Sequence, residues 1–112
     1  MKYLVLACFV GHTDDDNELW TNQWLVGTFD SLEECCAESE KDLEQVARDS
    51  LECRFENEEE FEREVQNYLS TKEMICRTDL DFKEQHPAII LSNDYWTNDH
   101  HEIIDYIVVK IN

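Results

Sequence analysis

The chain has 112 residues, enough for one domain with its own core, and its 27 acidic and 9 basic residues leave a net charge of −18 at pH 7. Such an acidic surface is repelled by nucleic-acid phosphates and by anionic lipid, and no apolar run approaches the ~20 residues that cross a bilayer, so direct nucleic-acid binding and membrane insertion are disfavoured. With 42% hydrophobic residues, two glycines and one proline, the composition indicates a folded domain rather than a disordered one.

The chain opens with two predicted strands. Residues 2–10 are apolar on both sides of an extended chain, which favours a strand covered on both faces. We interpret this run as a buried strand rather than an export signal, because it is short and leads directly into three aspartates. After a polar turn over 11–18, residues 19–29 place Trp20 and Trp24 on one face of a second strand. The two strands form a predicted hairpin.

A long amphipathic helix is predicted next, over residues 31–54. Ser31 followed by Glu34 is a capping box, which marks the start of a helix. Small and apolar residues then recur at steps of three and four, and this spacing predicts one inner stripe along the helix. The stripe consists of Leu32, Cys36, Ser39, Leu43, Ala47 and Ser50.

A second helix is predicted over residues 57–71. Asn57 followed by Glu60 repeats the capping pattern, and an apolar stripe follows it. The stripe consists of Phe61, Val65, Tyr68 and Leu69. Helix propensity alone does not decide whether the two predicted helices are separate or form one bent helix.

The C-terminal part is predicted to add two strands. Residues 72–87 are irregular in pattern, 88–91 begin a third strand, 93–101 form a polar turn region, and 102–111 form a fourth strand that is apolar on both sides. We therefore predict a single acidic α+β domain over residues 1–112. Its four-stranded antiparallel sheet (β-β-α-α-β-β) carries two amphipathic helices on one face, and its end strands pair centrally in the order 2-1-4-3.

The five cysteines are predicted to be free thiols. Their number is odd and their spacing contains no Cys-x-x-Cys, which favours a reducing compartment over a secreted disulfide framework. We accordingly expect a soluble, cytoplasmic protein. The cysteines are Cys8, Cys35, Cys36, Cys53 and Cys76.

The patterns that would indicate catalysis or a metal fail on inspection. The turn from Asp14 to Glu18 begins with the acid spacing of a calcium loop, but Leu19 and Leu25 stand where glycine and glutamate are needed. His100 and His101 are adjacent, so an extended chain points them to opposite sides. Acids surround Cys35 and Cys36 and disfavour a thiolate. We predict no enzyme activity, no metal and no cofactor.

The acidic segment over residues 30–64 is the main functional indication. It holds 15 acidic and 4 basic residues, a net of −11. If it were fully helical it would span ~52 Å, with one carboxylate per ~3.5 Å, close to the ~3.4 Å spacing of phosphates along a DNA strand. A solvated helix face needs no such excess of one sign, because mixed charges serve solubility equally well.

These observations predict a non-enzymatic acidic protein-binding module. Its carboxylates would occupy the basic groove of a nucleic-acid-binding protein or nuclease, as a nucleic-acid mimic. In size and charge, though in no motif, the chain is similar to the small acidic inhibitors that phages make against restriction or CRISPR systems. The alternative is a structural or regulatory subunit that forms a homodimer, or docks on a partner, through its sheet. The predicted partner-binding residues are Glu34, Glu38, Asp49, Glu52, Glu59, Glu60, Asp14, Asp15, Asp16, Tyr95 and Trp96.

Overall fold

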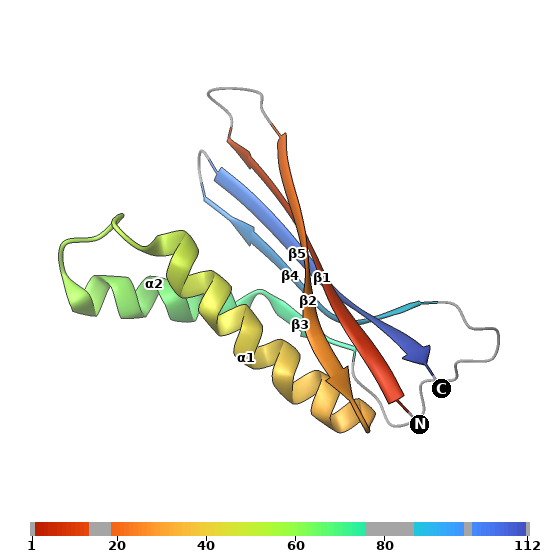
Figure 1. Cartoon of the computed structure of the whole chain (residues 1–112). Coiled ribbons are helices and arrows are strands. Elements are labelled where there is room, and N and C mark those ends of the chain that lie inside the picture. The colour runs from red at the N-terminus through yellow and green to blue at the C-terminus, as the bar shows by residue number, and fades with distance from the viewer. Residues whose placement is uncertain (1, 14–18, 76–86, 98–99, 112) are drawn as a thin grey trace.

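Two layers make up the fold: an antiparallel sheet and two helices that lie on one of its faces (Figure 1). The computed structural model describes residues 2–13, 19–75, 87–97 and 100–111. Their elements are β1 (Lys2–Thr13), β2 (Leu19–Phe29), α1 (Leu32–Leu51), α2 (Glu58–Ser70), β3 (Lys72–Met74), β4 (Ala88–Trp96) and β5 (His100–Ile111).

The sheet has five strands in the order β2-β1-β5-β4-β3. The order predicted for four strands is confirmed, and the two-sided apolar strands β1 and β5 do pair in the centre. The prediction of only four strands is wrong, because β3 adds a short edge. It pairs Lys72 with Asn93 and Met74 with Leu91. Its three residues are too few to show an alternating pattern, so no periodicity marks it in the sequence.

Strands β4 and β5 extend through most of the region predicted to be a polar turn. The prediction of a turn over 93–101 is wrong, because β4 continues to Trp96 and β5 begins at His100. Polar residues here are accommodated by at least one partner: Thr71 Oγ1 donates to Asn93 Oδ1 across 3.0 Å, although Nδ2 of Asn93 is buried without a partner among the described residues. A polar side chain with a partner costs little when a strand buries it, so polarity alone is a poor guide to strand ends.

Both predicted helix caps are confirmed. Ser31 Oγ accepts from the backbone N–H of Glu34 at 3.2 Å, and Asn57 Oδ1 accepts from that of Glu59 at 2.8 Å. The helices are separate rather than one bent helix. Cys53, with φ of 68°, adopts the left-handed conformation that ends helices. Within the described ranges, neither helix has the length and apolar character that a bilayer crossing requires.

The core lies between the helices and the inner faces of β1, β4 and β5. Val5 and Ala7 of β1 stand opposite Val108 and Tyr106 of β5, and all four are fully buried. Burial of a valine side chain such as Val5 or Val108 contributes roughly 1.5–3 kcal/mol. Against them α1 packs its buried residues, which are Cys35, Ser39, Leu43, Ala47 and Leu51. The stripe predicted for this helix is thus correct in its middle but rotated at its ends, where Cys36 and Ser50 are only partly buried.

This rotation of the buried stripe gives the two neighbouring cysteines of α1 different surroundings. Burial, followed by the negative charge of Glu34, raises the pKa of Cys35 to about 11. Cys36, at the edge of the helix interface, is disulfide-bonded, so the prediction that every cysteine is a free thiol is wrong. Cys76 lies outside the described residues. The free thiols of the described part of the chain are Cys8, Cys35 and Cys53.

The second face of the sheet is also apolar, and within the described residues no helix covers it (Figure 1). Four apolar residues stand in register across four strands of this open face: Leu25, Leu6, Ile107 and Ile89. The outer two are well exposed, Leu25 at 58% and Ile89 at 41%. The two-sided apolar strands therefore bury one face and leave the other accessible.

Candidate functional site

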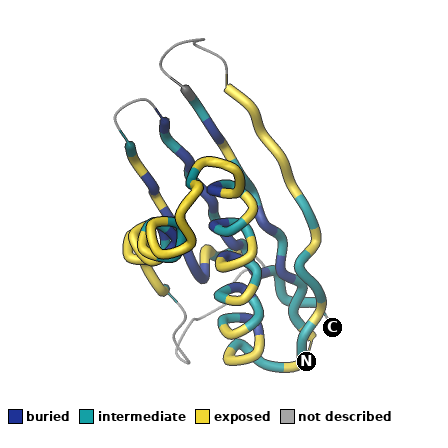
Figure 2. Tube along the Cα trace, turned by 90° about the vertical axis from the view of Figure 1, so that its left-hand side faces the viewer, coloured by how far each residue is buried: buried dark blue, intermediate teal, exposed yellow. Residues whose placement is uncertain are grey.

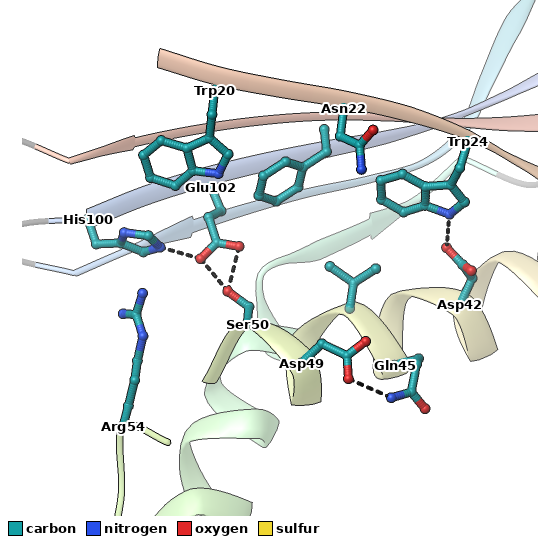
Figure 3. Close-up of a pocket in the computed structure, with 12 residues that line it drawn as sticks. Trp20, Asn22, Trp24, Asp42, Gln45, Asp49, Ser50, Arg54, His100 and Glu102 are labelled. Atoms are coloured by element: carbon teal, nitrogen blue, oxygen red, sulfur yellow. Dashed lines mark hydrogen bonds and ion pairs between the residues drawn. The ribbon is translucent and has the colours of Figure 1, made fainter. Parts of the chain in front are cut away.

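A cleft of about 500 Å³ opens between α1 and the part of the sheet formed by β1, β2 and β5 (Figure 3). The sequence builds it from two periodicities. Alternate residues of β2 place Trp20, Asn22 and Trp24 on its sheet side. On α1 a separation of seven residues, about two helical turns, places Asp42 and Asp49 on its helix side. Its volume lies in the range typical of small-ligand sites, roughly 300–1,000 Å³.

Gly11 gives Trp20 its place in the cleft. The two residues are paired across β1 and β2, and a Cβ atom on Gly11 would lie 2.2 Å from Cε2 of the Trp20 ring. The indole therefore lies flat over a residue without a side chain. Any larger residue at this position would push the indole away and reshape the cleft.

Glu102 lies at the closed end of the cleft and is 1% exposed. Ser50 Oγ donates to its two oxygens at 2.7 and 2.6 Å, and the hydroxyl of Tyr68 donates to Oε1 at 3.1 Å. Nε2 of His100 makes a further hydrogen bond to Oε2 (Figure 3). Burying a carboxylate is costly unless donors surround it. Here one residue from α1, one from α2 and one from β5 surround it, so Glu102 joins both helices to the sheet.

Asp42 joins α1 to the sheet in the same way at the other end of the cleft. Its Oδ2 accepts from Trp24 Nε1 at 3.0 Å and from the hydroxyl of Tyr106 at 2.7 Å. Burial, and then the hydrogen bond to Asp42, raises the pKa of Tyr106 far above its usual value. The cleft is therefore framed by two carboxylates that are fixed by sheet and helix donors.

Buried phenols make the fold sensitive to alkali. Burial is the main cause that raises the pKa of Tyr68 and of Tyr95. The charge of the nearby Glu102 raises the pKa of Tyr68 further, and the hydrogen bond to Glu64 does the same for Tyr95. An unfolded tyrosine ionises near pH 10. The folded state binds these protons more tightly, so this contribution to stability is present below about pH 10 and is lost as the pH rises above it.

We therefore expect phenolate absorbance from Tyr68, Tyr95 and Tyr106 to appear together with the loss of far-ultraviolet circular dichroism. An alkaline titration followed by both signals measures this. Ionisation of all the tyrosines near pH 10 with the circular dichroism unchanged would show that these phenols are not held as described.

The geometry around Glu102 differs from that of a nucleophilic serine site. A reactive serine needs its hydroxyl on a base such as histidine. Ser50 instead donates to Glu102, which stands between it and His100. Within the described ranges no three histidine, cysteine or acidic side chains are grouped closely enough to hold a metal ion. What the cleft offers chemically is hydrogen-bonding groups beside aromatic walls.

The acids predicted to bind a partner lie on the outward side of the helix layer. Figure 2 looks onto this layer, with exposed positions along both helices. Four of them are exposed and have no ion-pair partner among the described residues: Glu34, Glu52, Glu59 and Glu60. Asp49 is exposed at the cleft and accepts from Gln45 at 2.8 Å, and Glu38 pairs with Lys41 at 3.2 Å. Asp14, Asp15 and Asp16 lie outside the described residues, so their role stays a prediction.

Other acids of the segment are paired within the fold. Arg48 lies between Glu62, at 2.6 Å, and Glu44, at 3.2 Å, and so links α1 to α2. The hydrogen bond from Arg48 lowers the pKa of Glu62. Lys72 likewise pairs with Glu40 at 2.9 Å. Because α1 ends at Leu51 and α2 begins at Glu58, the acids form a two-helix surface rather than the single rod whose spacing matched a DNA strand.

The two aromatic residues predicted as partner contacts differ in outcome. Tyr95 is 3% exposed and stacks on Tyr68 with ring centroids 4.5 Å apart, so the expectation that it is accessible is wrong. Its position on β4 faces the helices, because the strand continues where a turn was predicted. Trp96 is 65% exposed and stacks on His101 with ring centroids 3.4 Å apart. It lies on the open face of the sheet, away from the helix acids.

The histidines do point to opposite sides, as predicted for neighbours in an extended chain. His100 faces Glu102 in the cleft, whereas His101 contacts Asp94 on the open face. The cleft itself was not predicted from the sequence. The alternation of Glu102, Ile104, Tyr106 and Val108 along β5 was the available signal, because it places the carboxylate on the same face as three core residues.

Comparison with known proteins returns no match among family models, curated proteins or solved structures.

Proposed function

We propose that this protein is a non-enzymatic acidic binding module whose helix layer occupies a basic groove on a protein partner. A groove that normally holds nucleic acid has the required charge. The main support is the uncompensated charge of Glu52, Glu59 and Glu60, which are exposed near the junction of α1 and α2 and have no cationic partner among the described residues. Repulsion among these carboxylates lowers the stability of the free protein, and a cationic partner would relieve that repulsion.

Charge would act chiefly on the encounter between the two proteins. Complementary surfaces raise association rates, and the gain falls as salt screens the charges beyond a Debye length of about 10 Å at 0.1 M. Rim charges alone give modest affinity, about 0–1 kcal/mol each. A stable complex therefore needs a more specific contact beside the acidic surface.

We expect binding to weaken steeply with salt. Proteins captured from a host lysate on the immobilised chain should elute as salt is raised, with nucleic-acid-binding proteins among them, and added DNA should compete with capture. The control is capture on an inert acidic protein of similar charge. A partner that binds equally at low and high salt would rule out this mechanism.

A second candidate function, docking through the open face of the sheet, is favoured by the apolar row Leu25, Leu6, Ile107 and Ile89. The occupant we propose is a second copy of this chain. The negative helix layers repel one another, whereas the described part of the open face carries fewer acids: Glu73 is exposed, Asp94 contacts His101 and Asp105 accepts from Ser92. Two copies can therefore approach through this face with less repulsion than through the helix layer.

Substituting Leu25→Lys should abolish such a dimer. Leu25 is exposed, so the change should alter stability by no more than about 0.5 kcal/mol. Light scattering at increasing concentration should show a dimer for the wild type and a monomer for the variant. A wild-type protein that stays monomeric throughout would remove this candidate.

A further inference from the structure

We infer that the cleft between α1 and the sheet receives a guanidinium cation, supplied by an arginine side chain of the basic partner. The inference rests on the proposed function, because it names the specific contact that the acidic surface lacks. The cleft adjoins that surface: Asp49 is at once one of the outward acids of α1 and a wall of the cleft.

The walls of the cleft suit a planar cation. Trp20, Trp24 and Phe9 provide aromatic surface on the sheet side. Cations are attracted to aromatic faces, and a guanidinium group also stacks on them. Asp49 provides an exposed carboxylate, and Asn22 provides an amide, so acceptors stand beside the aromatic surface.

His100 provides the observation that points to a ligand. Its ring lines the cleft and is 6% exposed, and its Nδ1 is buried without a hydrogen-bond partner among the described residues. Glu102 already accepts from Ser50 and Tyr68, so Nε2 of His100 is the nitrogen that donates to it. Nδ1 is therefore the ring nitrogen left without a partner, and an unsatisfied buried polar atom is costly. A small rotation of the ring would bring it to face a polar group bound in the cleft.

Arg54 allows the sign of the ligand charge to be tested. It follows α1, lines the cleft and extends toward His100 (Figure 3). The chain thus already places one guanidinium group at this site, and an incoming cation must compete with it. Removing Arg54 should strengthen binding of a cation and weaken binding of an anion.

The experiment uses tryptophan fluorescence of the full chain in a Trp96→Phe background. Of the three tryptophans, this leaves Trp20 and Trp24, both in the cleft. The probes are a short peptide with one central arginine, the same peptide with neutral citrulline, and blocked arginine amide. Saturable quenching by the arginine peptide but not by the citrulline peptide is expected. Weaker quenching by arginine amide would identify a side chain within a protein, rather than a free small cation, as the source.

Substitutions that each remove one charge then test whether the arginine peptide binds in the cleft. Arg54→Gln should tighten binding of the arginine peptide about fivefold and Asp49→Asn should weaken it about fivefold, the size expected for one nearby charge. Glu33→Gln removes the same charge from an exposed position in the first turn of α1, far from the cleft, and should leave affinity for the peptide unchanged. Equal effects of Asp49→Asn and Glu33→Gln, equal quenching by the citrulline peptide, or weaker binding after Arg54→Gln would each overturn the inference.

These outcomes separate the two proposals. If the arginine peptide does not enter the cleft while salt-sensitive partner binding persists, only the inference about the cleft fails. If the peptide binds the cleft but partner binding does not depend on salt, the proposed acidic mechanism fails and the cleft remains a guanidinium site.

Discussion

Replacing Glu102 with alanine should lower the free energy of unfolding by about 3 kcal/mol, a large part of the 5–15 kcal/mol typical of a small domain. The substitution leaves Ser50, Tyr68 and His100 without their common acceptor. Each buried donor that loses its partner costs roughly 1–3 kcal/mol, and water entering from the cleft offsets part of this loss. Equilibrium unfolding in urea measures the change.

Two further variants control this result. Glu102→Gln keeps the shape and an acceptor oxygen, so it should cost less than the alanine variant. Glu73→Ala removes an exposed acid from β3 and should stay within about 0.5 kcal/mol of the wild type. An alanine variant at Glu102 that unfolds at the same urea concentration as the Glu73 variant would show that Glu102 does not hold the helices to the sheet.

Neutralising the outward acids should have the largest effect on partner binding. At about 0.5 kcal/mol for each exposed charge, six substitutions correspond to about 3 kcal/mol, or about a 100-fold loss of affinity at low salt. The fold should survive, because these side chains are not part of the core. The substitutions are Glu34→Gln, Glu38→Gln, Asp49→Asn, Glu52→Gln, Glu59→Gln and Glu60→Gln. Circular dichroism checks folding, and the salt dependence of binding should flatten together with the loss of affinity.

The features of the fold that could be predicted from the sequence are those that depend on local chemistry. The capping signals at Ser31 and Asn57 located both helix starts within a residue, because an N-cap acts over three or four positions. The two-sided apolar pattern correctly placed β1 and β5 in the centre of the sheet, but the expectation that both faces are covered is not met, because within the described residues the helices cover one face only.

Features that depend on distant partners could not be predicted in this way. Ser50 lies 52 residues from Glu102, and Tyr68 lies 34 residues from it, so no local pattern indicates that they share hydrogen bonds. The same holds for Asn93 and Tyr95: their polarity predicted a turn, but the Asn93 amide oxygen accepts from Thr71 and the Tyr95 hydroxyl donates to Glu64, both distant in the sequence. Buried polar networks of this kind depend on tertiary contacts, which no local sequence pattern reveals.

The candidate site illustrates the same division. Exposure of the helix acids followed from the helical period, since residues opposite a buried stripe face solvent. The cleft depends instead on Gly11 of β1 making room for Trp20 of β2, and on α1 lying across both strands. Each of these is a relation between elements that no single segment encodes.

The most direct test of the acidic mechanism compares two variants with the same change in net charge. One carries Glu52→Gln, Glu59→Gln and Glu60→Gln in the helix layer; the other carries Glu73→Gln, Asp94→Asn and Asp105→Asn on the sheet. Affinity for the captured partner at low salt, measured by calorimetry, should fall about tenfold for the helix variant and stay within about twofold of wild type for the sheet variant. Equal affinities of the two variants would contradict the account.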